Sequence, residues 1–458
     1  MIKRLFFDGY HIPGRGDVWA AKGECEYRVG HPEKLGQMIV PEYPWEIACI
    51  NWVTVRQENG LWRAWYEAFS NPADDYGSIL CYAESHDGFH WEKPKLGICE
   101  FNGSKENNIV IDTAATGGLG FHGHSIFVDP SAPAEARYRC LFLGAVMAQG
   151  GDWKYPTLSY AYSADGIAWT MGAPELPRDY NNWPATGFGS DTQNIAYYDG
   201  SLRKYVGYFR VLNNAGRAIG RSETSNFINW PRPQEILSPD EYDPPRLDYY
   251  NNAATRIVEE GEVAHYIFYS AFDHDTDTLD LRLATSRDGI FYKRLDRTPL
   301  LKNDQPYDCG GLYATPGIFT LGDGRRCIAY NGVHRNHGNP LAHAGCDGGL
   351  VLAAFTKDRL QGMHVAKHYE FPVCGRVDPS CPEVTLNADI RGQIRGELID
   401  ENWKVIEGFG PEDCVPVRGN GTDLKLTWRG RSDLHDATLK LFVDDADLWA
   451  CTVNGEER

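Results

Sequence analysis

The chain has 458 residues, with 48 glycines, 26 prolines and 12% aromatic residues, and a formal net charge of −18. This charge disfavours nucleic acid and anionic membranes as partners, because both require a cationic face. The length is sufficient for a large core and for more than one domain, and the net charge favours a neutral or cationic ligand.

The N-terminal segment, MIKRLFFDGYHIPGRG, contains no apolar run of signal-peptide length, and no later segment reaches the length of a membrane span. We therefore expect a cytoplasmic protein. Several of the twelve cysteines fall within apolar runs, where a reduced cysteine behaves as a small hydrophobic residue. We expect free thiols.

A short pattern recurs along the chain: a serine, an Asp-Gly turn and an aromatic residue. Ser-x-Asp-Gly occurs at residues 85–88, 163–166 and 286–289, a further copy with a serine, a turn and an aromatic residue begins at Ser222, and a fifth, degraded copy begins at Thr356. Asp-Gly between apolar runs is typical of a tight hairpin, because glycine adopts positive φ at low cost and aspartate caps its own turn. Asp87, Asp165 and Asp288 are therefore predicted to be structural.

Two alternating, aromatic-rich runs precede each copy. In chain order the paired runs are 47–55 with 61–69, 124–130 with 137–145, 193–199 with 204–210, 253–259 with 264–272, and 315–321 with 325–331. Alternation with aromatic enrichment predicts strands rather than helices. Two inner strands and a hairpin make about four strands per unit, and five such units predict a five-bladed β-propeller. Two stacked sandwiches would explain the strands but not the repeat.

The pattern changes near residue 371, after which short alternating strands continue without the Ser-x-Asp-Gly signal. This change predicts a separate β-sandwich. We thus expect an all-β chain with a propeller catalytic domain at residues 1–369 and a β-sandwich domain at residues 370–458. An appended sandwich often packs on a neighbouring subunit, so a homo-oligomer is compatible with this organisation.

The innermost strands of a propeller run along its axis, so the residues at their starts converge on one end. The candidate catalytic acids at these starts are Glu46, Asp191, Asp248 and Asp308. The candidate substrate-binding residues are Trp45, Glu67, His122, His124, Gln193, Asn194, Arg210, Tyr250, Asn251, Tyr313 and His334. Amides and carboxylates bind sugar hydroxyls, aromatic faces stack on sugar rings, and two acids across a pocket can cleave a glycosidic bond.

Glu46 and Asp191 are the leading pair, as acid and as base or nucleophile. Each candidate acid also has a structural alternative, in which it caps a turn or pairs with an arginine. Whether the anomeric configuration is retained or inverted depends on the distance between the two carboxyl groups, which a sequence does not contain.

The order of five units, the Ser-x-Asp-Gly signals, the acids at strand starts and the C-terminal stretch DADLWACTV resemble glycoside hydrolase families 32 and 43. The segment GQIRGELIDENWKVIEGF is also similar to the C-terminal module of family 32. The resemblance implies a glycosidase that acts on a small oligosaccharide, above all a furanoside such as a β-fructoside or an α-arabinoside. No organic cofactor is implied.

These families take one acid from each of the first three blades. Here Glu46 stands first, His122 or His124 second and Asp191 third. The acid roles are therefore exchanged, or a further acid comes from blade four or five. A related propeller family uses a histidine as general acid, so His124 remains a candidate for that role.

Three alternatives remain open. The same fold can carry out transglycosylation or phosphorolysis, and the latter would require a cationic site such as Arg210 with Arg217 and Arg221. A second alternative is a non-catalytic, carbohydrate-binding propeller. A third is a metal-dependent hydrolase, because His334, His337, His343 and Cys346 have a spacing that allows zinc binding. We expect instead that this loop forms a polar rim without a metal.

Overall fold

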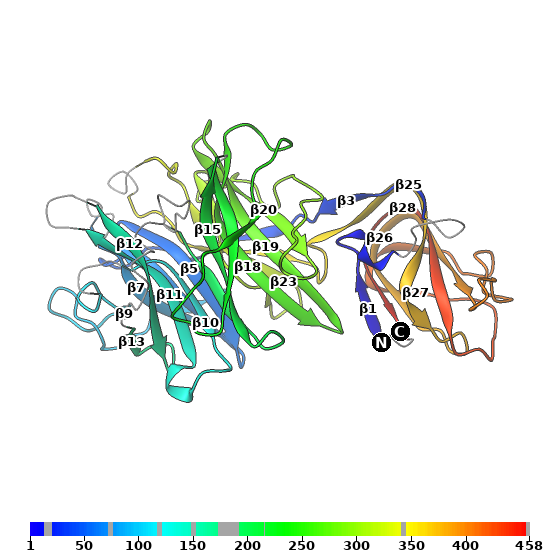
Figure 1. Ribbon diagram of the computed structural model, residues 1–458, viewed down its shortest axis with the longest axis horizontal. Coiled ribbons are helices and arrows are strands. Elements are labelled where there is room, and N and C mark those ends of the chain that lie inside the picture. The colour runs from blue at the N-terminus through cyan, green and yellow to red at the C-terminus, as the bar shows by residue number, and fades with distance from the viewer. Residues whose placement is uncertain are drawn as a thin grey trace.

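The computed structural model describes residues 1–12, 21–71, 77–116, 121–147, 153–172, 192–214, 216–339 and 345–454. This part of the chain is built from strands, together with two single-turn 3-10 helices, η1 (Gly9–His11) and η2 (Ala134–Ala136). The strands form two lobes, of which the smaller contains the C-terminal part of the chain (Figure 1). No helix in the described ranges is long and apolar enough to cross a membrane.

The larger lobe is a five-bladed β-propeller, as the repeat predicted. Blade one contains β5 (Cys49–Glu58), β6 (Leu61–Phe69), β7 (Ile79–Ser85), β8 (Trp91–Glu92) and β9 (Ile109–Ile111). Blade two contains β10 (His122–Val128), β11 (Tyr138–Met147), β12 (Trp153–Ser163) and β13 (Trp169–Met171). Blade three contains β14 (Ile195–Asp199), β15 (Lys204–Asn213), β16 (Gly216–Thr224) and β17 (Gln234–Leu237).

The last two blades share one continuous sheet. Blade four contains β18 (Leu247–Glu259), β19 (Glu262–Asp273) and β20 (Thr278–Ser286). Blade five contains β21 (Gly311–Ala314), β22 (Phe319–Thr320), β23 (Arg326–Val333), β24 (Leu350–Phe355) and the N-terminal strand β4 (Glu33–Ile39). The antiparallel pairing of β4 with β24 joins the two ends of the propeller in one blade, so that blade five does not end in an open edge.

The Ser-x-Asp-Gly segments form the same hydrogen-bonded turn in blades one, two and four. In blade one, the Oγ atom of Ser85 accepts from the amide of Gly88 at 2.9 Å, and Asp87 accepts from the amides of Phe89 and His90 at 2.8 Å each. Ser163 with Asp165, and Ser286 with Asp288, repeat these bonds. The recurring aspartates are therefore structural, as predicted.

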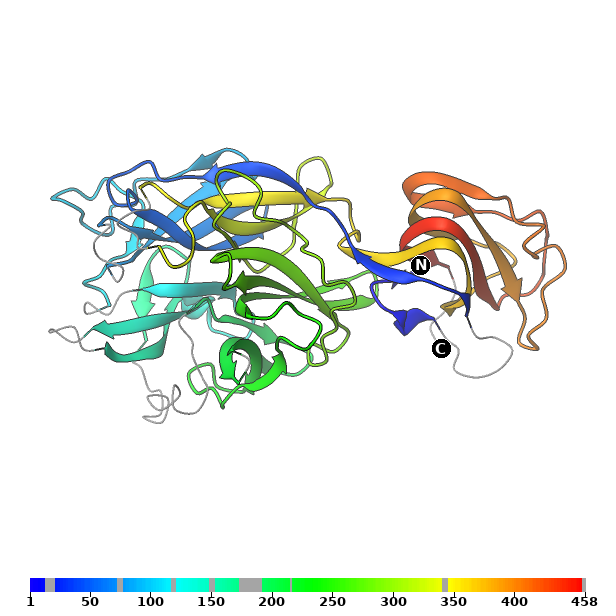
Figure 2. The same cartoon turned by 90° about the horizontal axis from the view of Figure 1, so that it is seen from above.

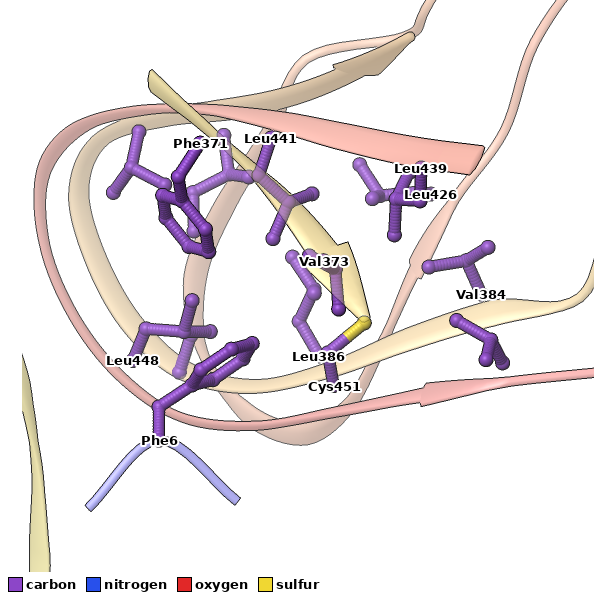
Figure 3. Packing of buried hydrophobic residues seen from close by; sticks show 14 of the residues in the cluster. Phe6, Phe371, Val373, Val384, Leu386, Leu426, Leu439, Leu441, Leu448 and Cys451 are labelled. Atoms are coloured by element: carbon purple, nitrogen blue, oxygen red, sulfur yellow. The ribbon is translucent and has the colours of Figure 1, made fainter. Parts of the chain in front are cut away.

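The smaller lobe is a β-sandwich built from long, bent strands. It contains β25 (Gln361–Val377), β26 (Val384–Ile399), β27 (Val417–Leu426) and β28 (Ala437–Val453), with β1 (Ile2–Leu5), β2 (Lys22–Gly23) and β3 (Glu26–Val29) from the N-terminus. The strands curve around buried side chains such as Phe371, Leu386, Leu448 and Cys451 (Figure 3). Shifts of register bend β25, β26 and β28 and thereby fold the sheet over its own core.

The N-terminal strands belong to the sandwich sheet. β1 pairs with the end of β28, and β3 runs beside the start of β25 between the two lobes (Figure 2). β25 itself continues through residue 370, where the sequence pattern suggested a boundary. We therefore propose a division in which the described residues between 33 and 360 form the propeller, and residues 1–12 and 21–29 join residues 361–454 in the sandwich.

One buried carboxylate ties the N-terminal segment to the propeller. Glu262 in β19 accepts hydrogen bonds from Arg4 at 3.0 Å and from Arg287 at 2.7 Å, and it lies 2.9 Å from His11 Nε2. Arg287 also donates to Asp8 at 2.9 Å. Because the side chain of Glu262 is 6% exposed, these contacts hold the segment against blade four where little solvent competes.

Candidate functional site

Three of the five innermost strands contain a β-bulge near their first residues. The register shifts at Trp52 in β5, between His122 and Ser125 in β10, and at Tyr250 in β18. Trp52 also has a positive φ of 32°. Bulges redirect side chains and are frequent beside active sites, so these positions point to the starts of the inner strands as the functional end of the propeller.

An aromatic wall lies at this end and is formed by blades one, four and five. Trp52 packs edge-on against Tyr313 with ring centroids 5.2 Å apart, and Tyr313 lies 5.8 Å from Tyr250. His337 contacts both Tyr250 at 4.7 Å and Phe272 at 4.6 Å. Burial, and then the nearby arginines, lower the pKa of His337 to about 4, so its ring is uncharged at neutral pH. Trp52, Phe272, Tyr250 and Tyr313 are each at most 9% exposed, so the wall is a packed aromatic cluster.

Three carboxylate–histidine pairs involve residues near the starts of the inner strands or the loops beside them, and the first joins Glu67 to His122. Oε1 of Glu67 lies 3.0 Å from Nδ1 of His122, whose Nε2 accepts a hydrogen bond from the indole of Trp52 at 3.3 Å. This arrangement places the proton of the neutral ring on Nδ1. The side chain of Glu67 is completely buried and that of His122 is 30% exposed. Oε2 of Glu67 has no hydrogen-bond partner.

The second pair joins Asp248 to His274, 2.9 Å apart. Asp248 also accepts from the guanidinium of Arg217 at 2.6 Å and from its amide at 3.2 Å. A Cβ atom at Gly216 would lie 2.0 Å from Asp248, so this close approach requires a glycine. Arg217 stands 5.2 Å from the ring centroid of Tyr250, which connects the pair to the aromatic wall.

The third pair joins Asp347 to His334, with Oδ1 and Nδ1 2.7 Å apart. Asp347 is 1% exposed and accepts from the amides of His334 and Gly348, at 2.8 and 2.7 Å. A backbone bridge to Cys49 places it at the start of blade one. Sequence reasoning identified His334 but missed Asp347, although the dipeptide Asp-Gly ahead of a buried strand was visible in the sequence.

Arg210, one of the substrate-binding candidates predicted from the sequence, contacts Tyr250 of the aromatic wall. Its guanidinium is stacked 4.2 Å from the ring centroid of Tyr250 and donates two bonds to the carbonyl of Tyr250, at 2.9 and 2.6 Å. Burial lowers the pKa of Arg210 to about 10, which keeps it charged at neutral pH. These contacts fix the position of Tyr250.

Glu46 and Trp45 lie in a separate network within blade one. Glu46 is completely buried and accepts from the hydroxyl of Tyr66 at 2.6 Å and from Lys93 at 2.9 Å. Two backbone amides donate to the same oxygen as Lys93. Trp45 donates its indole N–H to Asn108 at 2.9 Å. Protein donors therefore satisfy both carboxylate oxygens of Glu46, as expected of a structural carboxylate.

Asp308 repeats this arrangement in blade five. It is completely buried and accepts from Lys34 at 2.7 Å, from the hydroxyl of Tyr330 at 2.8 Å and from the amide of Gln305 at 2.9 Å. In both blades a lysine and a tyrosine therefore satisfy a buried acid. Neither Glu46 nor Asp308 contacts the aromatic wall through these bonds.

Four further candidates are buried inside the propeller. His124 is buried beside the carbonyl of Trp65, 3.1 Å from its Nε2, and burial lowers its pKa to about 3. Gln193 donates to the carbonyl of His124 at 2.7 Å, Asn194 to that of Thr192 at 3.0 Å, and Asn251 to that of Ala314 at 3.2 Å. The four residues are at most 1% exposed, and the bonds of Gln193 and Asn251 join neighbouring inner strands.

Asp191, the other leading acid, lies outside the described residues. The same holds for His343 of the proposed metal loop. Among the residues that the structure describes, no three His, Cys, Asp or Glu side chains gather closely enough to hold a metal ion.

No protein-family model matches the sequence, and no curated protein matches it. The fold is similar to that of a glycosyl hydrolase from Bacteroides ovatus, with 15% identity, a TM-score of 0.49, and coverage of 73% of this chain and 96% of the other. It is also similar to the catalytic domain of a GH62 α-L-arabinofuranosidase from Coprinopsis cinerea, with 14% identity, a TM-score of 0.47, and coverage of 71% and 97%. A GH32 β-fructofuranosidase from Bombyx mori has 10% identity, a TM-score of 0.45 and coverage of 94% of each chain.

Proposed function

We propose that this protein is a glycoside hydrolase, and that the carboxylate–histidine pairs beside the aromatic wall supply groups for its acid–base chemistry. The observation that carries the proposal is the Glu67–His122 pair, in which a buried carboxylate retains one oxygen without a partner. Leaving a buried acceptor unsatisfied is costly, and such groups are frequently functional. A substrate hydroxyl or a water molecule would satisfy this oxygen.

Glycoside hydrolysis requires one group that protonates the leaving oxygen and one that attacks the sugar or activates water. Glu67 is our candidate for one role. Asp191 remains the sequence-based candidate for the other, because it precedes the first alternating run of the third repeat in the sequence. His334, whose side chain is 44% exposed and backed by Asp347, is an alternative proton donor.

The substrate class that we propose is a furanoside in a small oligosaccharide, as the sequence resemblance implies. The aromatic wall supports this proposal indirectly, because Trp52, Tyr250 and Tyr313, at most 9% exposed each, pack together rigidly and fix the neighbouring His122 and Arg217. Arg217 and His274 beside Asp248 provide polar groups that suit ring hydroxyls.

The test is a screen of the purified protein against aryl glycosides and short fructans and arabinans, with and without phosphate. The screen is repeated with Glu67→Gln and Asp191→Asn. Turnover that both substitutions abolish supports the proposal. Turnover that requires phosphate would identify a phosphorylase instead, and transfer to a second sugar a transglycosylase. Binding without turnover would identify a carbohydrate-binding propeller.

A further inference from the structure

A cavity of about 380 Å³ lies on the propeller axis at the end opposite the candidate site. Residues from the inner strands of all five blades, or from the segment that follows the inner strand, line it. The lining residues are 56–57 in blade one, 125–127 in blade two, 195–198 in blade three, 254–257 in blade four and 316–319 in blade five. Since a strand rises about 3.3 Å per residue, Arg56 lies roughly 13 Å along β5 from Trp52. The cavity volume falls within the range of about 300–1,000 Å³ that is typical of small-molecule sites.

Arg56 brings a guanidinium group to this cavity. Its buried Nε has no hydrogen-bond partner, and burial lowers the pKa of its guanidinium. Glu58, a nearby acid, already accepts from Arg137 at 3.0 Å and from the hydroxyl of Tyr138 at 2.6 Å. A guanidinium presents a planar fork of donors that matches the oxygens of an oxyanion, so Arg56 is suited to bind such a ligand.

Arg256 supplies a second cation to the same cavity. Its Nε lies 3.5 Å from Oδ2 of Asp199, which is longer than a normal hydrogen bond, and its side chain is 27% exposed. Oδ1 of Asp199 is taken by Ser201. Ser125 and Tyr198 add hydroxyl groups to the lining. Arg56 and Arg256 both line the cavity, and no Asp or Glu is among its described lining residues, in a chain whose net charge of −18 otherwise repels anions.

We propose that this axial cavity binds an oxyanion of the phosphate class, either inorganic phosphate or the phosphate group of a small sugar phosphate. Arg56 is its principal ligand and Arg256 its second. The inference goes beyond the proposed hydrolase function, because neither Glu67 nor the aromatic wall contributes to the cavity.

The inference is tested by titration calorimetry of the full chain with inorganic phosphate, a hexose 6-phosphate and the neutral hexose. The parent protein should bind phosphate but not the neutral hexose. Arg56→Gln should weaken phosphate binding about 10- to 100-fold, as expected when a charged hydrogen bond is lost. Arg431→Gln, at an exposed arginine in the smaller lobe, is the matched control and should bind as the parent does. Tighter binding of the hexose phosphate would identify the sugar phosphate as the source of the anion.

Equal affinities of the parent and Arg56→Gln would overturn the inference, as would no detectable binding at about 10 mM phosphate. If Arg56→Gln does not fold, Arg256→Gln gives the same comparison. Glu67→Gln should bind phosphate as the parent does, so a failure of the hydrolase proposal leaves this result unaffected. If Arg217→Gln abolishes phosphate binding while Arg56→Gln does not, the anion occupies the candidate functional site and the axial assignment is wrong.

Discussion

Oε1 of Glu67 and Nδ1 of His122 lie 3.0 Å apart at the candidate functional site, and the second oxygen of Glu67 has no hydrogen-bond partner. The two residues come from different blades, since Glu67 lies in β6 and His122 begins β10. The contact therefore depends on how the blades pack. Its position beside Trp52 places an acid, a histidine and an aromatic surface within reach of one ligand.

Glu67→Gln is expected to reduce kcat/KM by about 10²- to 10⁴-fold, the usual contribution of a general acid or base. The midpoint of thermal unfolding should change little, because the amide keeps the shape of the side chain and one oxygen lacked a partner. Steady-state kinetics and a melting curve measure both quantities. Glu24→Gln, at an exposed glutamate, is the control and should leave both unchanged.

Glu46→Gln, in contrast to Glu67→Gln, is expected to reduce stability and leave activity unchanged. Breaking one partner of a buried ion pair typically costs about 3 kcal/mol or more, and Lys93, whose side chain is 5% exposed, would lose its buried partner. Urea unfolding should show this loss, while kcat/KM per folded molecule stays near that of the parent. A large loss of activity with unchanged stability would instead restore Glu46 as a catalytic residue.

Trp52→Phe removes the indole N–H that donates to His122 Nε2, but it retains an aromatic ring beside Tyr313. We expect kcat/KM to fall about 10-fold, because the histidine loses one of the two contacts that orient it. The decrease should appear mainly in kcat. Trp403→Phe, at an indole in the smaller lobe that is 50% exposed, should have no effect on either kinetic constant.

Acidification should destabilise the fold before most carboxylates titrate. Burial lowers the pKa of His124 to about 3 and that of His265 to about 4, so both stay neutral when folded, whereas the unfolded chain binds protons below about pH 6.5. Their stabilising contribution is thus complete above this pH and is lost as the pH falls toward the folded pKa. Each group changes the free energy of unfolding by up to about 1.4 kcal/mol per pH unit.

The measurement is urea unfolding at about pH 7 and pH 5. His124→Gln should make the difference between the two free energies smaller than in the parent. The same substitution at the exposed His86 is the control. An identical difference in the parent and in His124→Gln would contradict a buried, neutral His124.

The proposed domain division predicts that a fragment of residues 370–458 does not fold cooperatively. It lacks β1 and β3 and the first part of β25, so the edges of the sheet and part of the core beneath Phe6 would be exposed. A fragment of residues 361–458 mixed with residues 1–32 should regain strand structure by circular dichroism. Cooperative unfolding of residues 370–458 alone would support the boundary at residue 370.

Much of the architecture could be read from local patterns. The alternation of apolar and polar residues located the inner strands, and the Ser-x-Asp-Gly turns marked three of the blades, because a turn is made by its own side chains. The pairing of β1 with β28 could not be read in this way. It joins segments at opposite ends of the chain, and no local pattern specifies the partner of an edge strand.

The sequence alone determined which polar residues begin the inner strands, since those positions follow from strand period and order. Only the tertiary structure decided what each of them faces. Glu46 and Asp308 each contact a lysine and a tyrosine in their own blade, whereas Glu67 contacts a histidine from the next blade. Asp347 lies at the site because it contacts His334 and forms a backbone bridge to Cys49. The physical reason is that burial and pairing depend on groups distant in sequence, and these decide whether a carboxylate is satisfied or left for a ligand.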